Sequence, residues 1–112
     1  MNAAERFMSA IRRVGSAAEL LCEDGAPVPF LASIQPDRSL CAEDAGPLGV
    51  SRARRYILYA PPSRAAMLIG EDSRIQSGGL IFRALRAETF RISGAALYRR
   101  VNLELAGEGE EV

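Results

Sequence analysis

The stretch that decides the fold runs from Arg54 to Leu105 and reads RRYILYAPPSRAAMLIGEDSRIQSGGLIFRALRAETFRISGAALYRRVNLEL. It consists of short segments of alternating apolar and polar residues, separated by Pro-Pro, Gly-Glu-Asp, Ser-Gly-Gly and Ser-Gly. Such alternation, broken by turn residues about every eight to twelve positions, is typical of a small antiparallel β-barrel or sandwich. The sequence therefore predicts a mainly β fold.

The alternation predicts strands on both sides of a long loop. The expected segments of the sheet are residues 18–22, 28–34, 55–60, 66–69, 74–77, 80–87, 89–92 and 97–105. Glu23 to Ala26 and the Gly78-Gly79 pair have the composition of hairpin turns. The side chains expected to fill the barrel are Ile57, Leu68, Ile75, Phe82, Val101 and Leu103.

Residues 1–15 predict a short N-terminal helix ahead of this β-barrel domain, which spans residues 16–106. Phe7, Ile11 and Val14, with Met8 beside them, recur at spacings that place them on one helix face. Asn2 is suited to begin the helix and Gly15 to end it. A helix of about three turns is marginal alone, so we expect its apolar face to dock on the barrel or on a neighbouring subunit.

Two segments have no regular pattern. Residues 36–53 carry two prolines and two glycines, and a loop this long in so small a domain is usually functional or disordered. We expect this loop and the helix face to contact neighbouring subunits, through the candidate interface residues Phe7, Ile11, Arg38, Leu40, Leu48, Arg52 and Arg54. Residues 107–112, with three glutamates, predict a flexible acidic tail.

Composition argues against catalysis. The 112 residues include no histidine, which excludes Ser-His-Asp and Cys-His nucleophile systems. Acidic pairs such as Glu71-Asp72 lie in turn sequences and match no calcium loop, and Cys22 and Cys41 lack the spacing of zinc ligands. We therefore expect no enzyme activity and no catalytic, metal or cofactor-binding residues.

Charge and hydropathy limit the partners. The 14 arginines, with no lysine, balance 14 acidic residues, so the chain as a whole is not a cationic binder of nucleic acid or anionic lipid. The first residues do not resemble a secretory signal, and no window approaches the ~20 apolar residues of a membrane span. We expect both thiols to be reduced and partly buried, and no membrane partner.

Several motifs, taken in order, resemble the small head–tail connector proteins of long-tailed bacteriophages and prophages. The resemblance covers most of residues 30–105 and rests on the motifs FLASIQP at 30–36, RYILYAPP at 55–62, LIGED at 68–72 with Ile75, SGG at 77–79, Ala87-Glu88, and Leu97-Tyr98 with the terminal apolar strand. It implies a neck subunit of the stopper or adaptor type, made in the bacterial cytoplasm and located in the virion. Such subunits form a homo-oligomeric ring between portal and tail proteins, and DNA passes through the ring without sequence-specific binding.

A small nucleic-acid-binding β-barrel is the alternative. Three arginine pairs could line a nucleic-acid surface, namely Arg12-Arg13, Arg54-Arg55 and Arg99-Arg100. Tyr56, Phe82 and Tyr98 could stack on bases beside them. Arg99 and Arg100 are the candidate DNA-facing residues on this view. The balanced charge favours the connector.

Overall fold

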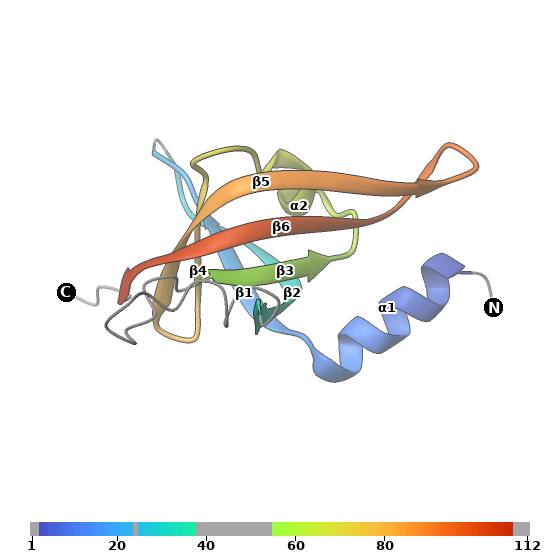
Figure 1. The fold of residues 1–112 in the computed structure, drawn as a ribbon, viewed down its shortest axis with the longest axis horizontal. Helices are drawn as coiled ribbons and strands as arrows, with labels where there is room; N and C mark the ends of the chain where they lie inside the picture. Colours follow the sequence, from blue (N-terminus) through green and yellow to red (C-terminus); the bar gives the residue numbers. More distant parts are fainter. Residues whose placement is uncertain (1–2, 24, 38–54, 109–112) are drawn as a thin grey trace, which may run out of the picture.

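The computed structural model describes residues 3–23, 25–37 and 55–108. Its elements, in chain order, are α1 (Ala3–Val14), β1 (Ser16–Leu21), β2 (Val28–Pro36), β3 (Arg55–Ala60), α2 (Arg64–Leu68), β4 (Arg74–Ser77), β5 (Leu80–Ile92) and β6 (Ala95–Glu108). The strands form a closed antiparallel barrel in the order β1-β2-β3-β6-β5-β4, with β4 pairing back to β1 (Figure 1). The predicted mainly β fold with a short N-terminal helix is confirmed.

Alternating residues of every strand fill the barrel. Leu58, Ile75, Val101 and Leu103 have no exposed surface, and Phe82 is 2% exposed. Tyr56 meets the Phe82 ring edge-on at 5.1 Å between centroids, a favourable aromatic geometry. The barrel interior is therefore a packed core and not a pore.

Two of the six predicted core residues were wrong. Ile57 is only half-buried, because its neighbours Leu58 and Ala60 take the inward positions of β3. Leu68 is 61% exposed, because residues 66–68 belong to α2 and not to a strand. Ser63 caps this short helix by accepting a hydrogen bond from the Ala66 amide, and the buried side chains of α2 are Ala65 and Ala66.

The last two strands are longer than predicted. The segments expected at 80–87 and 89–92 are one strand, β5, with an irregularity in its pairing to β6 between Ala84 and Arg86. At its other end β6 includes Gly107 and Glu108, which pair with Ile81 and Leu80. The first two residues of the predicted flexible tail thus belong to the sheet, and residues 109–112 lie outside the described part of the chain.

Candidate functional site

The β5–β6 hairpin projects beyond the barrel (Figure 1). Pairing between β3 and β6 stops at Arg99, and pairing between β4 and β5 stops at Arg83. In the described part of the chain, residues 90–98, which we call the arm, therefore pair only with one another. Ser93 and Gly94 form the turn at the tip with φ values of 53° and 83°. Two successive positive φ values match the right-handed twist of the flanking strands, so the arm continues the twist of the sheet.

A stack of three aromatic rings supports one face of the arm. Tyr98 lies between Phe7 of α1 and Phe90 of β5, and each of the two flanking ring centroids is 4.8 Å from that of Tyr98. Tyr59 of β3 meets the Tyr98 ring edge-on at 5.9 Å. The stack joins the N-terminal helix, the arm and the barrel wall.

The apolar face of α1 is consequently used within the chain. Ile11 is 3% exposed and Phe7 is half-buried in the stack. The end of the helix approaches β2 so closely that a Cβ on Gly15 would lie 3.1 Å from the backbone oxygen of Ala32. Phe7 and Ile11, predicted as subunit-interface residues, thus dock α1 on its own barrel. Val14, expected on the same face, is 67% exposed.

Arg99 lies inside the fold at the base of the arm. Its guanidinium donates one hydrogen bond to the Thr89 hydroxyl, at 2.7 Å, and another to the backbone oxygen of Ile69, just after α2. The residue is 9% exposed, and burial lowers the pKa of the guanidinium from its ordinary value. Arg99 is one of the predicted DNA-facing residues, but its side chain points inward. Residues two apart on a strand share a face, and Arg99 lies on the face of Val101 and Leu103.

Arg100 lies on the outer face of β6, beside a carboxylate. Glu88 lies 3.1 Å from the guanidinium of Arg86 and 3.9 Å from that of Arg100. The side chain of Arg100 is 35% exposed. Of the two predicted DNA-facing residues, only Arg100 reaches the surface, and there an acidic neighbour offsets its charge.

A second charged group crosses the outer surface of β5. Arg83 contacts Asp72 and Glu104, each at 2.7 Å. Hydrogen bonds to Glu104 and then to Asp72 raise the pKa of Arg83. Both ion pairs lie at the surface, where such pairs add little stability. Two carboxylates thus offset the charge of Arg83.

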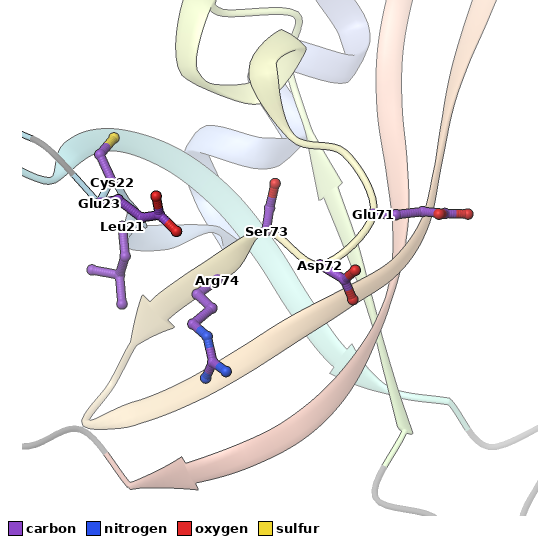
Figure 2. Close-up of a pocket in the computed structure, with 7 residues that line it drawn as sticks. All are labelled: Leu21, Cys22, Glu23, Glu71, Asp72, Ser73 and Arg74. Atoms are coloured by element: carbon purple, nitrogen blue, oxygen red, sulfur yellow. The ribbon is translucent and has the colours of Figure 1, made fainter.

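A shallow hollow of about 350 Å³ lies between the end of β1 and the turn before β4 (Figure 2). Its lining residues are Leu21, Cys22, Glu23, Glu71, Asp72, Ser73 and Arg74. The Glu23 side chain extends toward the other lining residues, whereas that of Glu71 extends away from them (Figure 2). Within the described residues, no three acidic or cysteine side chains are grouped so as to hold a metal ion. Cys22, predicted to be partly buried, is exposed.

Among the described residues, large apolar side chains are exposed at two places other than Val14. The first, the tip patch, consists of Phe90, 39% exposed, and Ile92, 51% exposed. The second, the α2 patch, consists of Met67, 39% exposed, and Leu68, 61% exposed. Exposed apolar groups set among polar neighbours are characteristic of interaction sites.

The remaining predicted interface residues cannot be placed beside these patches. Arg38, Leu40, Leu48, Arg52 and Arg54 lie outside the described residues. The arm is not predicted from the sequence, although Ile92-Ser93-Gly94-Ala95 carries a hairpin signal in Ser-Gly. The inward position of Arg99 is not predicted either, although the alternation of Val101 and Leu103 along β6 extends to it two residues earlier.

Comparison with protein-family models, with curated proteins and with solved structures found no match. None of the described helices is both long enough and apolar enough to cross a bilayer.

Proposed function

We propose that this protein is a structural subunit of a phage or prophage virion, a head–tail connector that forms a ring between portal and tail. The observation that carries the proposal is a packed barrel from which a braced arm projects with an apolar tip. A contact element of this kind serves assembly. The resemblance of residues 30–105 to small connector proteins supports the same reading.

The placement of the acidic and apolar side chains agrees with a subunit that acts through contacts with other proteins. The described acidic residues do not converge on a metal site, and the hollow beside Cys22 is shallow and open. The apolar tip and α2 patches, by contrast, lie on a hairpin braced by the aromatic stack and on a helix whose buried alanines face the barrel. Elements that are ordered before association hold a contact surface in place at less entropic cost.

A nucleic-acid-binding barrel receives less support. Arg99 is buried, while the outward-facing Arg83, Arg86 and Arg100 each have a carboxylate within 4 Å. Tyr98, the aromatic side chain nearest to Arg100 along the hairpin, is stacked between Phe7 and Phe90. Carboxylates therefore offset the charges of these outward-facing arginines, and the Tyr98 ring is already stacked within the chain.

The decisive experiment is an in-frame deletion of the gene in the phage or prophage that carries it. Induced lysates examined by electron microscopy should contain heads and tails that are not joined. A plasmid copy of the wild-type gene should restore joined particles, and mass spectrometry should find the protein in them. Normal infectious particles from the deletion strain, or particles lacking the protein, would refute the proposal.

A further inference from the structure

We infer that α1 is exchanged between copies of the chain, so that the helix of one copy docks on the barrel of the next. The receiving surface, which we call the helix site, consists of Tyr59, Tyr98 and the part of β2 at Ala32. This inference rests on the proposed ring and identifies the contact that links its subunits. The occupant of the helix site is α1 of a second copy.

The helix site already fits α1, which contacts β2 and β6 within one copy. The Phe7 ring stacks on that of Tyr98 with 4.8 Å between centroids and 19° between planes. Ile11, one helical turn later, is 3% exposed. Exchange reproduces these contacts without change and requires no new complementary surface. For this reason the exchange of an identical element is a low-cost route to association.

The connection between α1 and the barrel is very short. α1 ends at Val14 and β1 begins at Ser16, so Gly15 alone joins them. The Gly15 amide donates a hydrogen bond to the Ile11 oxygen, which extends the helix to the edge of the barrel. A Cβ at this position would be crowded by the Ala32 oxygen, at 3.1 Å. Such a connection restricts how the helix folds back on its own barrel, and short connections favour exchange between copies.

Docking within one copy leaves part of the apolar face of α1 uncovered. Phe7, Ile11 and Val14 recur at spacings of four and three, which place them on one helix face. Ile11 is buried and Phe7 is partly buried, yet Val14 is 67% exposed. In an exchanged pair, the donor barrel begins two residues after Val14, while the receiving barrel covers Ile11. The two barrels therefore meet at Val14, and the neighbouring copy supplies the cover that its own barrel does not.

α1 and the helix site are unlike surfaces, which sets the symmetry of the assembly. One-way exchange is a heterologous contact and generates a ring when the rotation closes, whereas reciprocal exchange gives a two-fold dimer. At about 1.5 Å per residue, the 12 residues of α1 extend about 18 Å. α1 and the arm extend to the same side of the barrel (Figure 1). Exchange consequently joins neighbouring barrels side by side through this end of the subunit.

The test is photo-cross-linking in the full chain. Phe7 is replaced by p-benzoyl-phenylalanine, which keeps an aromatic ring at the stack and reacts with the groups that it contacts. Unlabelled and isotope-labelled copies are mixed in denaturant, refolded together at high concentration and irradiated. Mass spectrometry should find peptides of α1 and β6 joined between labelled and unlabelled copies as often as between like copies. The same replacement at Arg12, an exposed position of the same helix, is the matched control and should give no cross-link to β6.

The length of the connection provides the second readout. A Gly-Ser-Gly insertion after Gly15 lets α1 reach its own barrel more freely, so it should lower the mixed-label cross-links severalfold. The same insertion ahead of Ala3, at the other end of α1, should leave them unchanged. Equal effects of the two insertions would contradict the inference.

Three outcomes of the photo-cross-linking would overturn the exchange: cross-links between like-labelled peptides only, no cross-link at all, or a protein that light scattering finds monomeric at every concentration. If heads and tails still depend on the gene for joining in that case, the connector function stands without the exchange. Mixed-label cross-links in a protein whose deletion leaves normal infectious particles would instead refute the connector and leave the exchange standing.

Discussion

The guanidinium of Arg99 and the backbone oxygen of Ile69 share a hydrogen bond that ties the root of the arm to the end of α2. Thr89 accepts the second bond from the same group. No described carboxylate pairs with this cation, so its desolvation is balanced only by neutral acceptors. Burial of Arg99 therefore costs solvation energy, while its two hydrogen bonds connect the base of the arm to the end of α2.

Arg99→Ala should lower the free energy of unfolding by about 2 kcal/mol, because it leaves a buried carbonyl and a hydroxyl without their donor. Urea unfolding followed by circular dichroism measures the loss. Arg91→Ala, which alters an exposed arginine of the arm, is the control and should change stability by less than ~0.5 kcal/mol. Equal effects of the two substitutions would contradict the structural role of Arg99.

Phe82→Ala should cost on the order of 3 to 5 kcal/mol, as expected for truncation of a fully buried aromatic side chain. Phe90→Ala is the comparison, because Phe90 is 39% exposed and should cost clearly less. If Phe82→Ala does not fold, Phe82→Leu gives a smaller loss that can be measured. A loss below about 1 kcal/mol for Phe82→Ala would place this ring outside the core.

Phe7→Ala should release α1 from the barrel, since a helix of this length is marginal without tertiary contacts. Amide hydrogen exchange should show lost protection in residues 3–14 and retained protection in the β3–β6 pairing. Val14→Ala, at an exposed position of the same helix, should leave the exchange pattern unchanged. Unchanged protection of α1 in Phe7→Ala would mean that the aromatic stack does not hold the helix.

Arg83→Ala should lower stability only slightly, because both of its ion pairs lie at the surface, where water screens them. The difference in stability from wild type should shrink in 1 M salt, because the Debye length there is only about 3 Å and surface charges are screened. Arg74→Ala, which removes the exposed arginine opposite Arg83 in the β4–β5 register, is the control. A large loss that is insensitive to salt would show that Arg83 acts through packing.

DNA binding by the isolated chain should be weak and non-specific, because the chain has no net positive charge. Fluorescence anisotropy with duplex and single-stranded DNA at ~150 mM salt should give a Kd no tighter than the 10⁻⁴ to 10⁻⁶ M that is typical of non-specific binding. Arg100→Ala should alter it little. Nanomolar affinity that disappears in Arg100→Ala would favour the nucleic-acid-binding alternative over the connector.

Sequence alternation predicted the barrel because the inward positions of its strands are apolar almost throughout. Ile75, Phe82, Val101 and Leu103 lie where that pattern places them. α2 escaped prediction because its five residues are too few to show a helical period. The signal that could have revealed it is local: a Ser cap after Pro-Pro, followed by alanines with high helix propensity.

The candidate site was less predictable because it depends on tertiary pairing. An apolar stripe that includes Phe7 and Ile11 predicts that α1 docks somewhere, but only the position of Tyr98 decides that it docks within the chain. Likewise, the exposure of Phe90 and Ile92 follows from where β3 and β4 stop pairing, which no local pattern specifies.

The stacking of Phe7 on Tyr98 has a consequence for biosynthesis, since it joins α1 to β6, and the other strands lie between them in the sequence. α1 leaves the ribosome before β6 does, so its docking surface is complete only when β6 has been translated, at about 5 to 20 residues per second. During that interval the apolar stripe of the nascent helix has no native partner. Completion of β6 is thus the step that allows the apolar face of α1 to be buried. Chains truncated before this strand should therefore be retained by chaperones.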